Sequence, residues 1–172
     1  MIKNILLYPF SFVAFIAIQV LVLNNIQFSG FINPFLYILF ILWLPIEMPK
    51  WLVMVVSALL GMAVDVFSNT LGMHMSASIF LAFCRPYVLS ILAPRDGYET
   101  NAVPNQQQMG LSWFMTYASI GTILHHLFLF FVEVFRFNEV WRTIGRSLAS
   151  SLFTLLLILI TQLFYYNREE RK

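Results

Sequence analysis

The sequence predicts an all-α membrane protein, a single transmembrane domain over residues 1–172 built as a bundle of six helices. Of the 172 residues, 60% are hydrophobic and only 10% are charged, whereas soluble domains carry about 25% charged residues. Apolar runs long enough to cross a bilayer recur along the whole chain. The formal net charge is only +2, so we expect no nucleic acid among the partners.

The first two predicted helices cover about 5–23 and 31–48. The first apolar run is longer than the hydrophobic part of a typical signal peptide, and no small-residue cleavage site follows it, so we expect it to be retained. The second run opens with Asn33, a good N-cap residue, followed by proline at the first helical position. Pro45 and Pro49 are expected to end this helix.

Four more helices are expected at about 51–68, 71–93, 111–135 and 147–166. The two-residue link between the third and the fourth makes them antiparallel neighbours. The polar stretch 94–110 contains two prolines, two glycines and three glutamines and is expected to be a solvated loop. The shorter interruption 136–146 mixes apolar residues with three arginines, so we expect it to lie along the membrane surface.

The distribution of basic residues predicts that both termini lie in the cytoplasm. An even number of spans puts both ends of the chain on one side of the membrane. The inner face then carries Lys3, Lys50, Arg95, Arg168, Arg171 and Lys172, and the outer face carries Arg136, Arg142 and Arg146. This bias has the direction that the positive-inside rule expects. The turn between the third and fourth helices is therefore predicted to face outward.

The third and fourth helices are joined through SALLGMAVDVFSNTLGMH, which contains one carboxylate, Asp65. A charge inside the bilayer is costly, about 2.5–3.5 kcal/mol at the centre. Its presence beside a tight turn therefore indicates that the carboxylate has a specific structural or functional role. Ser57, Gly61, Asp65 and Ser68 share one helix face, and small residues there let a neighbouring backbone come close. Two roles stay open for the carboxylate: a lock that accepts hydrogen bonds from residues 68–70, or a charge that a partner recognises.

The other ionisable residues are sorted by depth along the helices. At about 1.5 Å per residue, Asp65 and Arg85 lie at different depths, so no salt bridge between them is expected. Arg85 is expected to be satisfied by snorkelling or by a helix-end carbonyl. Asp65 is expected to share its layer with His74, Glu133 and Arg136, and the last two, three positions apart, are predicted to form a local pair.

The histidine pair His125 and His126 is expected to pack or hydrogen-bond between helices, because no cysteine or second acid sits at ligand spacing. Cys84 is expected to be a small core residue. A stripe of small polar residues on the sixth helix is expected to face inward: Ser147, Ser150, Ser151, Thr154 and Thr161. No phosphate-binding loop, nucleophile elbow or paired carboxylates are present, so we expect no enzyme activity, no catalytic residue, no metal and no cofactor.

The residues from Gly61 to His74 resemble the G-x-x-x-D-x-x-[SG]-x-x-x-G signature of MreD, the family of rod shape-determining membrane proteins. Gly61, Asp65, Ser68 and Gly72 carry the match. The chain length, the number of spans and the position of the motif are also similar to that family. The resemblance implies a fold like that of the substrate-binding subunits of energy-coupling-factor vitamin transporters.

This resemblance implies a non-enzymatic scaffold in the bacterial cytoplasmic (inner) membrane. It would belong to the cell-elongation machinery and help to regulate peptidoglycan synthesis, with MreC as its direct partner. MreB and the RodA–transpeptidase wall synthase would be nearby. Such a scaffold acts by stabilising one arrangement of its partners over another. The structural or partner-binding candidates are Gly61, Asp65, Ser68, Gly72, His74, Arg85 and Glu133.

The alternative is a small-molecule (vitamin) binding subunit of a membrane transporter. Its pocket would open outward near Asp65, His74, Trp141 and Glu133. A long ordered outer loop over the first helices would favour this function. The segment 24–30 is short and uncharged, which disfavours it. A plain channel is a third class, and the sequence lacks the charged ring or repeated pore motif that it needs.

Overall fold

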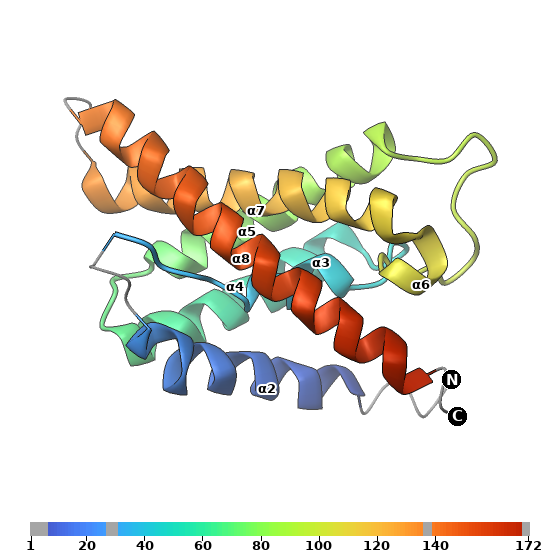
Figure 1. Cartoon of the computed structure of the whole chain (residues 1–172), viewed down its shortest axis with the longest axis horizontal. Helices are drawn as coiled ribbons and strands as arrows, with labels where there is room; N and C mark the ends of the chain where they lie inside the picture. The colour runs from blue at the N-terminus through green and yellow to red at the C-terminus, as the bar shows by residue number, and fades with distance from the viewer. Residues whose placement is uncertain (1–6, 27–30, 136–138, 170–172) are drawn as a thin grey trace.

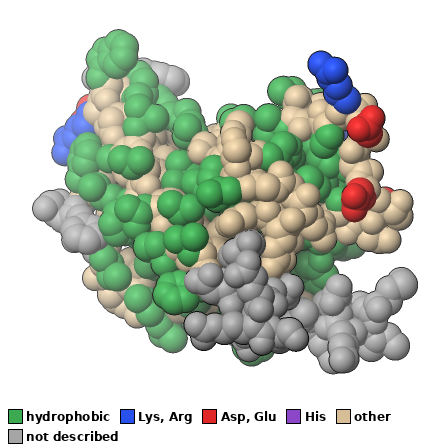
Figure 2. Space-filling model, turned by 45° about the vertical axis from the view of Figure 1, so that its right-hand side comes forward, with side chains coloured by type: hydrophobic (Ala, Val, Ile, Leu, Met, Phe, Trp, Pro, Cys, Tyr) green, Lys and Arg blue, Asp and Glu red, His purple; other side chains and the backbone are tan. Residues whose placement is uncertain are grey.

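The computed structural model describes residues 7–26, 31–135 and 139–169, and its regular structure within these ranges is helical, with no strand. Four helical segments are long and apolar enough to cross a membrane: Tyr8–Asn25, Lys50–Ser68, Leu111–Val134 and Val140–Phe164. Figure 2 shows one face of the molecule, where charged side chains lie at two opposite edges and hydrophobic side chains cover much of the surface between them. The described helices therefore have the length and apolar composition of a multi-pass membrane protein.

The elements follow one another as α2 (Leu7–Leu21), η1 (Leu23–Asn25), α3 (Ile38–Trp43), α4 (Lys50–Ser68), α5 (Met73–Ile91), α6 (Gln106–Met109), α7 (Leu111–Val134) and α8 (Val140–Glu169). In Figure 1 the beginning of α2, the end of α8 and the loop before α6 lie on the same side. We name that side the loop end, after residues 94–110. The opposite side, with the α4–α5 turn over 69–72, is the turn end.

Helices α4 and α5 form the tightest antiparallel pair, and they lie within two residues of the predicted helices 51–68 and 71–93. α4 stops at Asn69, whose φ of 54° is left-handed, as is common just past a helix C-terminus. A Cβ added at Gly61 would meet the His74 carbonyl oxygen at 2.5 Å and the Met75 Cα at 2.6 Å. Glycine at this position therefore lets the two backbones touch, as the small-residue face predicts.

The predicted continuous helix over 31–48 is wrong. Only Ile38–Trp43 is helical, six residues, and the segment before it is made of turns and irregular backbone. The segment nevertheless runs through the middle of the bundle, where the side chains from Tyr37 to Leu42 are at most 4% exposed. The segment is apolar at almost every position because it is buried on all sides. Its sequence therefore shows no helical periodicity of apolar and polar residues. This segment, with α3, forms the centre of the hydrophobic core.

Side chains of other helices satisfy the irregular backbone of this segment. The hydrogen bonds run from Asn33 N to Ser150 Oγ (3.1 Å), from Phe35 N to Thr154 Oγ1 (3.1 Å) and from Gln19 Nε2 to Pro34 O (3.0 Å). Non-helical backbone at membrane depth is tolerated only where protein or a cavity supplies such partners. The inward-facing polar stripe of α8 thus holds the broken segment in place.

Two smaller predictions are also corrected. The last helix begins at Val140, seven residues before the predicted start of 147–166. Residues 140–146 therefore form its first turns and no separate surface segment, while 136–138 lie outside the described residues. Cys84 is half-buried, because α5 turns this position toward the outside of the bundle, and it is not a core residue.

Candidate functional site

The Asp65 carboxylate links the end of α4 to the start of α5. Its Oδ1 accepts hydrogen bonds from the Thr70 hydroxyl (2.5 Å) and the His74 amide (3.0 Å), and Oδ2 accepts from the Met75 amide (2.8 Å). The first amides of a helix have no partner within that helix, and a negative charge is favourable there. The buried Asp65 carboxylate (4% exposed) therefore caps the N-terminus of α5 from the end of α4, through its bonds to these two amides. Of the two roles left open by the sequence, the lock expects a hydrogen bond from residues 68–70, and Thr70 makes one. The two amides come from α5 and not from the turn.

The other signature residues also serve the hairpin. Ser68 Oγ accepts a hydrogen bond from Asn24 Nδ2 (2.9 Å), and Asn24 Oδ1 accepts one from Gln19 Nε2 (2.9 Å). These bonds tie the end of α2 to the end of α4. Gly72 is the N-cap of α5 with a φ of 78°, which costs glycine much less than any other residue. The motif thus specifies the geometry of the turn end.

A chain of buried polar rings lies beneath the hairpin. The Tyr37 hydroxyl is hydrogen-bonded to His74 Nδ1 (3.1 Å) and His125 Nε2 (2.8 Å). His126 Nδ1 donates to the Thr122 carbonyl (2.9 Å), and its Nε2 contacts the Thr154 hydroxyl (3.1 Å). The expectation that these histidines hydrogen-bond between helices is confirmed. Among the described residues, no group of three or more His, Cys, Asp and Glu side chains is arranged to hold a metal ion.

A cavity of about 360 Å³ opens at the turn end, which we call the turn-end cavity. Its polar lining includes Asn24, Asn33, Ser68, His74, Glu133 and Arg146, and apolar side chains such as Phe35 and Leu129 complete the wall. Two residues that the transporter alternative places at its pocket are not part of this lining. Both carboxylate oxygens of Asp65 accept hydrogen bonds within the hairpin, and Trp141 is 85% exposed.

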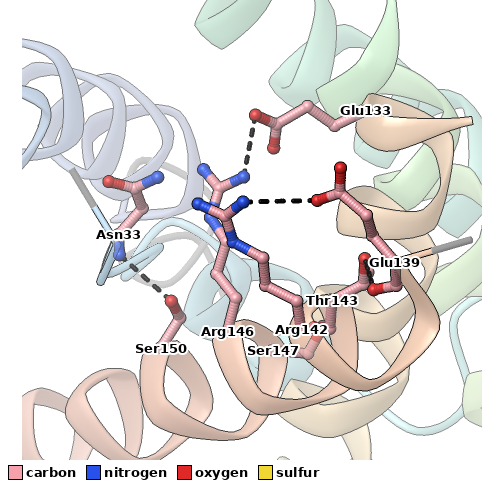
Figure 3. A network of polar contacts seen from close by, with 8 residues as sticks. All are labelled: Asn33, Glu133, Glu139, Arg142, Thr143, Arg146, Ser147 and Ser150. Carbon is pink, nitrogen blue, oxygen red and sulfur yellow. Dashed lines mark hydrogen bonds and ion pairs between the residues drawn. The ribbon is translucent and has the colours of Figure 1, made fainter. Parts of the chain in front are cut away.

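Arg146 is the cation at the mouth of this cavity. Its Nη1 lies 3.0 Å from Glu133 Oε1, and Figure 3 shows the two side chains pointing toward each other. With the Asn33 amide oxygen turned toward Arg146, that oxygen accepts from Nη2 at 2.8 Å. The guanidinium carbon also lies 4.3 Å from the centroid of the Phe130 ring, a cation–π contact. The predicted partner of Glu133, Arg136, lies outside the described residues.

The sequence prediction misses Arg146 as a site residue, because it assigns this arginine to the interruption 136–146. A signal is present in the sequence, since Arg146 lies four positions before Ser150 and eight before Thr154. These spacings put the three residues on one face of a helix. Extending the last helix toward its N-terminus brings Arg146 to the inward face.

Arg85 lies at the opposite end of the bundle from Asp65, so the expectation of no salt bridge between them agrees with the structure. Its side chain is buried, with the residue 3% exposed. Nε donates to the Tyr117 hydroxyl (2.9 Å), and Nη2 donates to the carbonyl oxygens of Leu44 and, at 3.5 Å, Pro45. Leu44 is the C-cap residue of α3. Of the two predicted solutions, the helix-end carbonyl is the one observed.

The structure separates the candidate residues into two groups. Gly61, Asp65, Ser68, Gly72, His74 and Glu133 belong to the hairpin or to the cavity beside it, and Arg85 belongs to the loop end. The turn-end group combines the capped start of α5, the ion pair of Glu133 with Arg146, and amide side chains. These groups can bind a partner or ligand, and the one acid of the hairpin, Asp65, is already hydrogen-bonded. Comparisons of the chain with protein-family models, with curated proteins and with solved structures find no match.

Proposed function

We propose that this chain is a non-enzymatic scaffold of the bacterial cell-elongation machinery, with MreC as its direct partner. The observation that carries the proposal is the use of the motif from Gly61 to His74. Both oxygens of its one carboxylate, Asp65, are occupied by hydrogen bonds inside the hairpin. The motif therefore builds a rigid shape, and a scaffold needs a shape where an enzyme needs a reactive group.

The proposed setting is the cytoplasmic membrane, with both termini in the cytoplasm and the turn end outward. The lysine and arginine bias of the sequence supports this orientation. The common side of the start of α2 and the end of α8 supports the even number of crossings (Figure 1). MreB and the RodA–transpeptidase wall synthase would belong to the same machinery and lie nearby. This chain would act on them through binding and would catalyse no reaction.

The surface proposed for the partner is the tip of the hairpin. Leu71 is 99% exposed there, and Phe67 on the last turn of α4 is also exposed. Because Asp65 and Gly61 hold the hairpin rigid, a partner that binds the tip meets one fixed shape. Binding of a preformed surface avoids the cost of ordering it, and the scaffold can then favour one arrangement of its partners.

The test is co-purification of MreC with this chain from detergent-solubilised membranes. We expect the wild-type chain to retain MreC and Leu71→Ser to retain at least several-fold less. Leu111→Ser is the matched control, since Leu111 is also exposed but lies at the loop end. Failure of the wild-type chain to retain MreC would contradict the proposal, and equal loss in both variants would contradict the assigned surface.

A second candidate function is the outward-opening small-molecule binding subunit of a vitamin transporter. The turn-end cavity favours it, because about 360 Å³ falls in the usual range of ligand sites, about 300–1,000 Å³. Broken segments such as the one before α3 also line binding sites in many transporters. Under this candidate the chain shares the six-crossing fold of energy-coupling-factor subunits. A vitamin that raises the melting temperature of the purified chain would favour it over the scaffold.

A further inference from the structure

A second cavity, of about 290 Å³, lies at the loop end between α4, α5 and the turn that joins α3 to α4. We call it the loop-end cavity. Its lining combines two cations, Lys50 and Arg85, one acid, Glu47, and the apolar side chains of Val53, Ala82 and Leu89. It lies at the opposite end of the bundle from the hairpin and the turn-end cavity, so a ligand bound there is independent of the proposed function.

Arg85 forms no ion pair within the described part of the chain, and Glu47, the acid that lines the same cavity, is not within ion-pair distance of it. The ion pairs there are those of Arg142 with Glu139 and Arg146 with Glu133. The partners of Arg85 are a hydroxyl and backbone carbonyls, all of which are neutral. Buried charges are normally paired with an opposite charge, because their desolvation is otherwise poorly compensated.

The guanidinium of Arg85 also has N–H groups that make no hydrogen bond within the described part of the chain. It carries five N–H groups, and the observed hydrogen bonds use Nε and Nη2. Nη1 has no hydrogen-bond partner among the described residues, although the residue is 3% exposed and lines the cavity. A positive charge and unused donors thus meet an open volume at the edge of the bundle.

We propose that the loop-end cavity binds a phosphate group, supplied by the headgroup of a phospholipid. A guanidinium matches the oxygens of phosphate with paired hydrogen bonds, and the Lys50 ammonium at the rim adds a second cation. The apolar wall of Val53, Ala82 and Leu89 suits the lipid's glycerol and the first part of its acyl chains. Inorganic phosphate offers the same chemistry from solution, so the experiment separates the two sources.

The depth of the cavity suits a headgroup. Lys50 is the first residue of α4, and Arg85 lies six residues before the end of α5, about 9 Å along the helix axis. The Arg85 guanidinium stays inside the bundle, where it donates to the carbonyl oxygens of Leu44 and Pro45. A headgroup phosphate at the helix ends would therefore meet Lys50 directly and reach Arg85 through the loop-end cavity.

The experiment is native mass spectrometry of the full chain purified in detergent. The chain is mixed separately with phosphatidylglycerol, with diacylglycerol of the same acyl chains and with inorganic phosphate. We expect the phospholipid adduct to be retained at least ten-fold more than the diacylglycerol adduct. Retention of inorganic phosphate with no gain for phospholipid would overturn the lipid assignment and leave a phosphate site for a soluble ligand.

Variants make the test specific to the cavity. Arg85→Gln and Ala82→Leu, which fills the cavity and leaves both cations, are each expected to lower retention at least ten-fold. Arg95→Gln removes the same charge from the exposed loop and is expected to retain the adduct. If Arg85→Gln does not fold, Ala82→Leu decides. Equal retention of diacylglycerol, or unchanged retention in the cavity variants, would overturn the proposal.

Discussion

At the scale of single residues, the Asp65 carboxylate shows how the motif works. Both of its oxygens accept hydrogen bonds, one from Thr70 and His74 and the other from Met75. The acid could be picked out from the sequence, because a charge in an apolar helix is costly. Its amide partners could not, because the first turn of α5 reaches it only through the close approach of two helices at Gly61.

Asp65→Asn is expected to destabilise the chain by about 1–3 kcal/mol. The new amide group would turn an N–H donor toward the amide of His74 or of Met75, where the structure needs an acceptor. Chemical unfolding in detergent measures the effect, and Asp96→Asn in the exposed loop is the control. Wild-type stability of Asp65→Asn would show that the hydrogen bonding of the oxygen replaced by the amide nitrogen contributes little to stability.

Glu133 illustrates the limit of reasoning about single residues. Its partner in the structure is Arg146, thirteen positions away on the next helix, whereas the sequence pattern predicts Arg136. Spacing along one helix predicts local pairs, but a pair between two helices depends on where the second helix begins. The early start of α8 at Val140 is the fact that the pattern did not supply.

At the scale of elements, the close contact between α4 and α5 is tested at Gly61. Gly61→Ala is expected to destabilise the chain by about 1–3 kcal/mol, because its Cβ would meet the backbone of His74 and Met75. Gly145→Ala is the matched control, since nothing lies within 4 Å of a Cβ there and alanine favours helix. Equal melting temperatures for the two variants would contradict the close contact.

The broken segment 31–48 is the element that sequence periodicity failed to predict. The segment is apolar on all sides, so its pattern cannot distinguish a helix from buried irregular backbone. The information lies elsewhere in the chain, in the hydroxyls of Ser150 and Thr154 that accept from its backbone amides. The polar stripe of the last helix was visible in the sequence, but its partner was not.

Thr154→Val tests this support. Phe35 N would lose its acceptor while buried, at a cost of about 1–3 kcal/mol in the free energy of unfolding. Thr161→Val is the control, because the bond that the Thr161 hydroxyl makes within the described ranges goes to Leu157 O in its own helix. Unfolding in detergent compares the two variants. Loss of equal size in both would mean that the hydroxyl of Thr154 does not hold the broken segment.

At the scale of the whole molecule, composition was sufficient for the class of the protein. Four of the described helices are long and apolar enough to cross a membrane, and the hairpin and the long loop lie at opposite ends (Figure 1). Membrane orientation is a separate prediction from the basic residues. On a Cys84→Ser background, Gln107→Cys is expected to resist impermeant thiol reagents in intact cells, and Leu71→Cys at the exposed tip is expected to react. The reverse pattern would invert the orientation.

We propose that the Asp65 hairpin is a structural lock that presents a surface to MreC. The most direct measurement is the amount of MreC retained per folded molecule, compared between the wild-type chain and Asp65→Asn. We expect Asp65→Asn to lower the yield of folded protein, because the capping of α5 is weakened, and to leave the MreC retained per folded molecule unchanged. A well-folded Asp65→Asn that fails to retain MreC would contradict the lock and show that the partner recognises the charge itself.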